Sequence, residues 1–112
     1  MATTPKALFN PLQAGTGEAT QYTTPAGTRT IIDKFTGTNT TGAAATLTVK
    51  LVPNAGAPGA SNTISSAKTL AAGETYTFPE LVGHVLNTGD YISTLASTAT
   101  AITIRASGRE IT

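Results

Sequence analysis

Few residues in this sequence could carry out chemistry. His84 is the only histidine among the 112 residues, and there are no cysteines. A metal site at His84 would therefore need carboxylate ligands, and Glu80 is the only carboxylate at a suitable spacing. Gly83 lies between the two, and on a strand or turn their side chains would not converge as they would on a helix. The sequence predicts a structural or interfacial histidine, with no metal site and no cofactor.

The carboxylates are the other groups that could do acid–base chemistry. A glycosidase would need two of them facing each other across a sugar-binding cleft. Such clefts are usually lined by aromatic rings, and the chain has three Tyr, three Phe and no Trp. The six carboxylates are scattered along the chain at Glu18, Asp33, Glu74, Glu80, Asp90 and Glu110. We therefore expect no catalytic residues and a protein that is not an enzyme.

Charge is sparse in this chain. Asp, Glu, Lys and Arg make up 12% of the residues and the net charge is +1, whereas an ordinary soluble domain has about 25% charged residues. Either much of the surface contacts other protein copies, or the surface is neutral and rich in hydroxyl groups. Binding to nucleic acid needs clustered cations, and the Lys and Arg residues occur singly along the sequence. We expect no nucleic-acid partner.

Long apolar runs are missing from the sequence. None approaches the roughly 18 residues of a membrane-spanning helix. The apolar patch at 7–9 is far shorter than the core of a signal sequence. We expect no membrane partner and no targeting for secretion.

The elements that position these side chains are short β-type segments bounded by Gly, Pro or Asn. Leu47, Val49 and Leu51 alternate with Thr and Lys, which is typical of a strand with one buried face. No segment has apolar residues at helical spacing, so the class is all-β, an antiparallel Greek-key sandwich of jelly-roll or immunoglobulin-like type. About seven or eight strands are predicted, over 18–24, 28–38, 46–51, 63–70, 74–78, 81–86, 91–96 and 101–107.

The predicted strand 28–38 has an irregular pattern. Ile31, Asp33 and Phe35 would share one face, while Ile32 and Lys34 would share the other. Either a β-bulge breaks the alternation or both faces are partly covered.

Residues 1–14 differ from the single β-sandwich domain expected over 15–112. Pro5 and Pro11 bracket Leu8, Phe9 and Leu12, which favours an extended segment that cannot lie in the centre of a sheet. The segment is either an arm that docks its three apolar side chains on a neighbouring subunit, or an edge strand packed on its own domain.

Several Gly-containing turn pieces follow one another between residues 21 and 110, and each would set the register of the strands beside it. The pieces are YTTPAGT (22–28), NTTG (39–42), LVPNAG (51–56), LAAGETY (70–76), VLNTGDYI (85–92) and ASGRE (106–110). In order and spacing they are similar to those of small β-sandwich virion proteins of tailed bacteriophages. Within that group the chain most resembles capsid decoration, or cement, proteins.

This resemblance implies a virion structural protein made in the bacterial host cytoplasm and placed on the outer capsid surface. Its partners would be the major capsid protein, whose neighbouring subunits it staples, and further copies of itself in a homo-oligomer. The alternative is a neck, tail or fibre-associated sandwich with an adaptor or host-surface-binding role. Loop 54–62 would then carry the contacts.

A cement protein would act by mass action. If it binds only the assembled, expanded lattice, it stabilises that lattice against the pressure of the packaged DNA. Leu8, Phe9 and Leu12 are the candidate apolar anchors. On that hypothesis, replacing all three with Ser weakens particle binding and leaves the fold intact.

Overall fold

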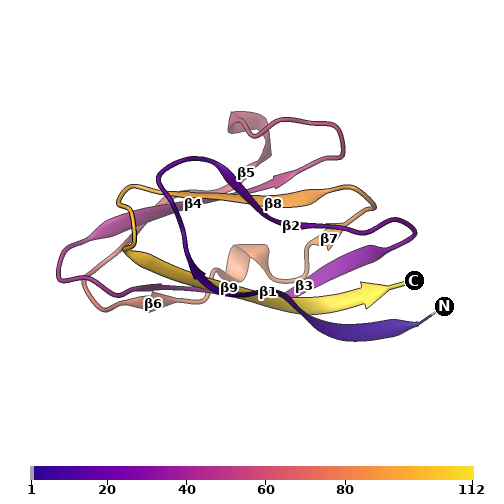
Figure 1. Cartoon of the computed structure of the whole chain (residues 1–112), viewed down its shortest axis with the longest axis horizontal. Helices are drawn as coiled ribbons and strands as arrows, with labels where there is room; N and C mark the ends of the chain where they lie inside the picture. The colour runs from indigo at the N-terminus through magenta and orange to yellow at the C-terminus, as the bar shows by residue number, and fades with distance from the viewer. Residues whose placement is uncertain (1) are drawn as a thin grey trace.

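The computed structural model describes residues 2–112, and within this range it contains nine strands and two short 3₁₀ helices (Figure 1). No helix in this range is long and apolar enough to cross a membrane. The elements are β1 (Thr3–Gln13), β2 (Ala19–Thr23), β3 (Arg29–Asn39), β4 (Ala45–Val52), η1 (Ala60–Asn62), β5 (Thr63–Leu70), β6 (Thr75–Tyr76), η2 (Pro79–Leu81), β7 (Val85–Leu86), β8 (Tyr91–Ala96) and β9 (Ile102–Ile111).

The strands form two antiparallel sheets packed in two layers (Figure 1). The five-stranded sheet has the order β1-β9-β3-β6, with β7 also paired to β3. The four-stranded sheet has the order β2-β8-β4-β5. The prediction of an all-β antiparallel sandwich is confirmed. Nine strands occur in residues 2–112 because the amino-terminal segment adds one to the eight segments predicted.

Two predicted strands are much shorter in the structure. Only Thr75–Tyr76 of 74–78 and only Val85–Leu86 of 81–86 pair with β3. Between them the chain turns at Phe78, whose φ is 44°, into η2. Pro79, which has no N–H to donate to a ladder, begins this helix. The alternation of apolar residues did not reveal this interruption.

The core lies between the two sheets and contains a chain of aromatic rings. Phe35 is fully buried, and its ring centroid lies 5.9 Å from that of Phe9 and 5.2 Å from that of Phe78. Both contacts are edge-to-face, the arrangement that aromatic pairs favour. Leu47 and Val49 of β4 are also fully buried, as their alternation predicted, whereas Leu51 is only partly buried and its neighbour Val52 is fully buried.

The irregular pattern in β3 is explained by a β-bulge. The pairing of β3 with β9 shifts register between Ile32 and Lys34, which leaves Asp33 as the extra residue. As a result Ile32 and Phe35 both point inward and are fully buried. Gly108 of β9 pairs with Ile32 beside this bulge.

Residues 3–13 are an edge strand and not a projecting arm. β1 pairs antiparallel with β9, with register shifts along its length. Leu8 and Phe9 are buried in the core, and Leu12 packs against it half-buried. Of the two interpretations of this segment, the structure therefore has the strand packed on its own domain. The physical reason is that apolar surface lies within reach on β9 and β3, so the side chains need no neighbouring subunit to leave water.

The two ends of the described chain lie side by side (Figure 1). The backbone N–H of Ala2 donates to the carbonyl of Thr112 at 3.1 Å, and the N–H of Thr112 donates to the carbonyl of Ala2 at 2.9 Å. These bonds extend the β1–β9 ladder by one residue pair.

Candidate functional site

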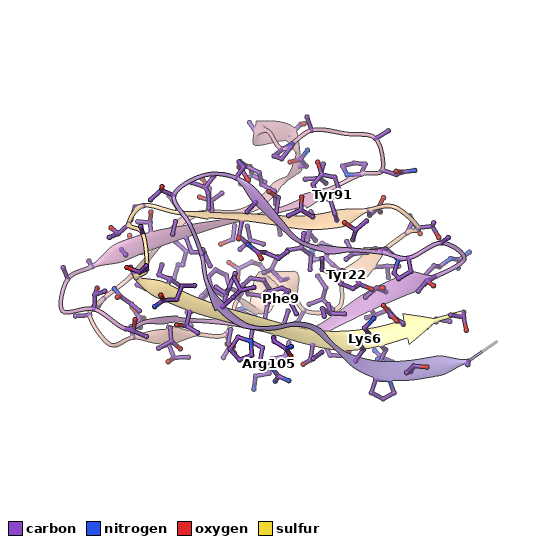
Figure 2. The ribbon with its side chains drawn as sticks, in the orientation of Figure 1. Lys6, Phe9, Tyr22, Tyr91 and Arg105 are labelled. Atoms are coloured by element: carbon purple, nitrogen blue, oxygen red, sulfur yellow. The ribbon has the colours of Figure 1, made fainter. Side chains whose placement is uncertain are left out.

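The outer face of the five-stranded sheet collects basic side chains from its two central strands. In β9 the residues at even positions from Ile102 to Gly108 are buried, so Arg105 and Arg109 point outward. Figure 2 shows Arg105 directed away from the other sheet. In β3, Lys34 pairs with Ser107 and Arg29 with Ile111, both at outward positions of β9. We call Arg29, Lys34, Arg105 and Arg109 the basic face.

The few charged residues of this chain are distributed unevenly over its surface. It holds four of the seven Lys and Arg residues. Within residues 2–112, Asp33 is the only carboxylate that the β3 and β9 registers place on this face. The rest of the chain has three cations and five carboxylates. The face is therefore positive while the remainder of the molecule is negative.

Sequence reasoning missed this cluster because its members are far apart along the chain. A strand period of two puts Arg105 and Arg109 on one face. Arg29 and Lys34 are five positions apart, so a regular strand would place them on opposite faces. The bulge at Asp33 reverses the alternation and brings both outward. The irregularity at 31–35 was the available signal, but the sequence left two explanations for it.

Arg109 is already paired on this face. Its Nε lies 3.2 and 3.1 Å from the two carboxylate oxygens of Asp33, and its Nη2 lies 3.1 Å from Oδ1. Both side chains are a little over 40% exposed, so the pair contributes only about 0–1 kcal/mol to folding. Among residues 2–112, Arg29, Lys34 and Arg105 form no ion pair. Three cations of the basic face are thus free to bind another molecule.

The carboxylates that were considered for catalysis are each held by a different group of donors. Asp90 accepts from the backbone N–H groups of Asn54 and Asn87, both at 2.9 Å. The remaining pairs are Glu18 with Lys50 and Ser93, Asp33 with Arg109, Glu74 with the Ala71 N–H, Glu80 with Tyr76, and Glu110 with Lys6 and Tyr22. These contacts fix turns and strand pairs, which gives each carboxylate a structural role.

His84 lies on the surface between η2 and β7. Its backbone carbonyl accepts from the N–H of Ile32 at 3.0 Å, which ties this segment to the edge of β3. Within residues 2–112, no group of three or more His, Cys, Asp or Glu side chains is placed to hold a metal ion.

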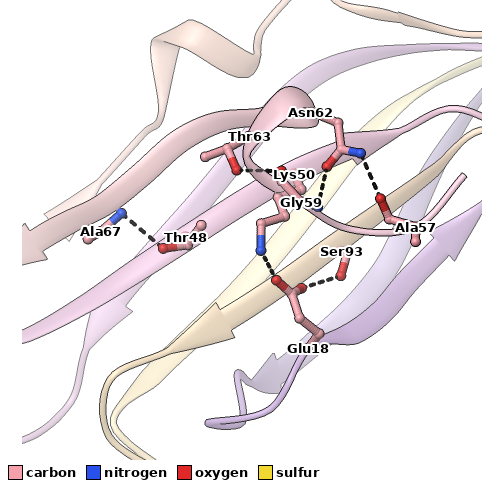
Figure 3. A network of polar contacts seen from close by, with 9 residues as sticks. All are labelled: Glu18, Thr48, Lys50, Ala57, Gly59, Asn62, Thr63, Ala67 and Ser93. Atoms are coloured by element: carbon pink, nitrogen blue, oxygen red, sulfur yellow. Dashed lines mark hydrogen bonds and ion pairs between the residues drawn. The ribbon is translucent and has the colours of Figure 1, made fainter.

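Loop 53–62 is held in place on the outer side of the four-stranded sheet. The amide of Asn62 donates to the carbonyl of Ala57 at 2.9 Å, and its oxygen accepts from the N–H of Gly59 at 3.0 Å (Figure 3). The hydroxyl of Tyr91 donates to the carbonyl of Gly56 at 2.9 Å. The loop is largely exposed, and these bonds define its shape.

A polar cluster connects the two sheets near the chain ends. The Tyr22 hydroxyl of β2 donates to Glu110 Oε2 of β9 at 2.5 Å and lies 2.7 Å from the Thr30 hydroxyl of β3. Lys6 of β1 reaches the same Glu110 oxygen at 3.3 Å. Burial, followed by the hydrogen bond to Glu110, raises the pKa of Tyr22 to about 12.

A pocket of about 390 Å³ lies at the end of the sandwich where the two chain ends meet. It is lined by Gly27, Thr28, Arg29, Thr88, Ile111 and Thr112.

Alkaline pH should weaken the hydrogen bond between Tyr22 and Glu110. The folded-state pKa of Tyr22 lies above the ordinary value of 10.0. The stabilisation by its protonated hydroxyl is therefore complete below pH 10 and is lost as the pH rises towards 12. Tyr22→Phe removes the hydroxyl and should lower the free energy of unfolding at pH 7 by about 1–2 kcal/mol. The difference between the two proteins should shrink above pH 10, as measured by denaturant unfolding across the pH range. A difference that stays constant up to pH 12 would contradict this role of Tyr22.

Comparison with known proteins identifies no relative of this chain. No protein-family model matches the chain, no curated protein matches it, and no solved structure matches it.

Proposed function

We propose that this chain is a structural protein of a bacteriophage particle, a decoration protein that binds neighbouring major capsid subunits on the outer capsid surface. The observation that carries the proposal is the basic face, which concentrates four of the seven cations on one face of the five-stranded sheet. Such a surface suits docking on another protein and holds no arrangement of acid, base and nucleophile.

The basic face is also well supported mechanically. β9 lies between β1 and β3, and β3 is paired with β9 on one side and with β6 and β7 on the other. The backbone of a strand that is paired at both edges is already ordered before binding. Less of the binding free energy is therefore lost in ordering the residues of the interface. A protein that acts only by binding an assembled lattice benefits from such a preorganised surface, because its whole effect is mass action.

We propose the basic face as the docking surface in place of the apolar side chains of residues 8, 9 and 12. Leu8 and Phe9 are less than 10% exposed and belong to the core of their own domain. Replacing Leu8, Phe9 and Leu12 with Ser would therefore unfold the sandwich before it tested any interface. Contacts between copies of this chain remain part of the proposal, as does production in the bacterial host cytoplasm.

The second candidate is a neck, tail or fibre-associated protein with an adaptor or host-surface-binding role. Loop 53–62 favours it, because Asn62 and Tyr91 hold this protruding segment in one shape. A defined loop can present backbone carbonyls and hydroxyl groups to a partner with little loss of entropy.

Cryo-electron microscopy of the purified particle tests the proposal. Density for the sandwich repeated across the icosahedral shell is the expected result. A ring of copies at one vertex would favour the neck or tail instead. If the chain is missing from purified particles that carry the other virion proteins, the virion proposal itself is wrong.

A further inference from the structure

We infer that the basic face recognises a carboxylate-rich protein surface, with Lys34 and Arg105 as its anchors and Asp33 as an internal competitor for Arg109. This inference rests on the proposed function, since it states what the capsid subunit must present to the docking surface. It assigns opposite roles to residues on the same face. Removing the cation of Arg105 should weaken binding, whereas removing the charge of Asp33 should strengthen it.

The first step is the spacing of the free cations. Lys34 pairs with Ser107, which lies between Arg105 and Arg109 along β9. The register makes Arg105 a diagonal neighbour of Lys34, and such neighbours are about 7–8 Å apart on adjacent strands. Alternate residues on a strand are separated by a similar distance of about 6–7 Å. A partner with two carboxylates at this spacing would contact both cations at once.

The second step is the pair that the face already contains. Asp33 shows how a carboxylate binds here, because both of its oxygens lie within 3.2 Å of the Arg109 guanidinium. An intramolecular carboxylate at this position occupies the donors that a partner would use. Asp33 therefore lowers the positive charge of the face and prevents Arg109 from joining the contact.

The third step is the chemistry around the cations. The other outward residues of β3 and β9 include the hydroxyls of Thr36, Thr38, Thr103 and Ser107, all half-buried. None of the outward positions on these two strands carries an aromatic ring. Single-stranded nucleic acid is bound largely by stacking on such rings, which the basic face does not offer. Guanidinium groups among hydroxyls suit the carboxylates and backbone carbonyls of a protein surface.

The experiment measures binding of three variants to two probes. The probes are poly-L-glutamate and phage particles that lack this protein. Arg105→Glu is expected to weaken binding to both probes by about tenfold or more at about 0.1 M salt. Asp33→Asn keeps the side-chain shape at the bulge and is expected to tighten binding by about threefold to tenfold. Lys68→Glu changes the charge as much as Arg105→Glu does, but on β5 of the other sheet, and should change binding by less than about twofold.

The outcomes separate the inference from the proposed function. If poly-L-glutamate binding follows the expected order and particles do not bind, the decoration proposal fails and the carboxylate preference stands. If particles bind equally well with all three variants, the docking surface lies elsewhere and this inference is wrong. Tighter binding to duplex DNA or to phosphatidylserine vesicles than to poly-L-glutamate would also overturn it. Thermal unfolding of each variant shows that a loss of binding is not a loss of fold.

Discussion

Phe35→Ala should lower the free energy of unfolding by about 3–5 kcal/mol, the usual cost of removing a large buried aromatic side chain. Phe35 is fully buried in the middle of β3 and contacts the rings of Phe9 and Phe78. Its removal leaves a cavity between the sheets and takes away both edge-to-face contacts. Since small domains are stable by only about 5–15 kcal/mol, this one change removes a large fraction of the total.

Urea unfolding followed by circular dichroism measures this loss. The midpoint should fall while the slope with denaturant stays the same, because the native fold is retained. Phe35→Leu is the matched control, since it fills most of the volume and should cost less than half as much as Phe35→Ala. Equal stabilities for the wild-type protein and Phe35→Ala would mean that the ring is not packed between the sheets as described.

Gly108→Ala should destabilise the protein by about 3 kcal/mol or more, well above the usual effect of a small surface change. A Cβ at Gly108 would lie 2.2 Å from the carbonyl oxygen of Ile31 and 3.2 Å from the carbonyl carbon. These are backbone atoms of the adjacent strand, so no side-chain rotation relieves the overlap. Either the β3–β9 ladder separates here or the bulge at Asp33 moves.

Gly42→Ala is the control for this change. Nothing lies within 4 Å of the Cβ position at Gly42, so the substitution should alter stability by less than about 0.5 kcal/mol. Thermal unfolding and the yield of folded protein should distinguish the two variants. Similar melting temperatures for Gly108→Ala and Gly42→Ala would show that the strands are not in close contact at this point.

The layered β architecture could be predicted from the sequence because local patterns determine it. Leu47 and Val49 alternate with threonines, and this alternation alone identifies a strand with one buried face. The partners of each strand could not be predicted, because pairing depends on contacts between residues far apart in sequence. The role of Leu8 and Phe9 was uncertain for the same reason, since the sequence does not reveal which apolar surface lies nearest.

The basic face could not be predicted from the period of a strand alone, because it also depends on the β-bulge in β3. Arg105 and Arg109 can be placed together from the period of a strand, but Lys34 joins them only if β3 contains the bulge at Asp33. The bulge is in turn compatible only with a glycine at position 108, where a side chain would meet the backbone of Ile31. A buried glycine in β9 thus permits the bulge that places Lys34 on the opposite surface of the sheet.

The pairing of Ala2 with Thr112 has a practical consequence for engineering. Because the backbones of the two ends are hydrogen-bonded, a linker of a few residues could join them without moving β1 or β9. Loop 53–62 lies on the outer side of the other sheet and is a natural place for new ends in a circularly permuted chain. Peptides fused to the existing ends would emerge beside Thr28 and Thr88, which line a pocket together with Ile111 and Thr112.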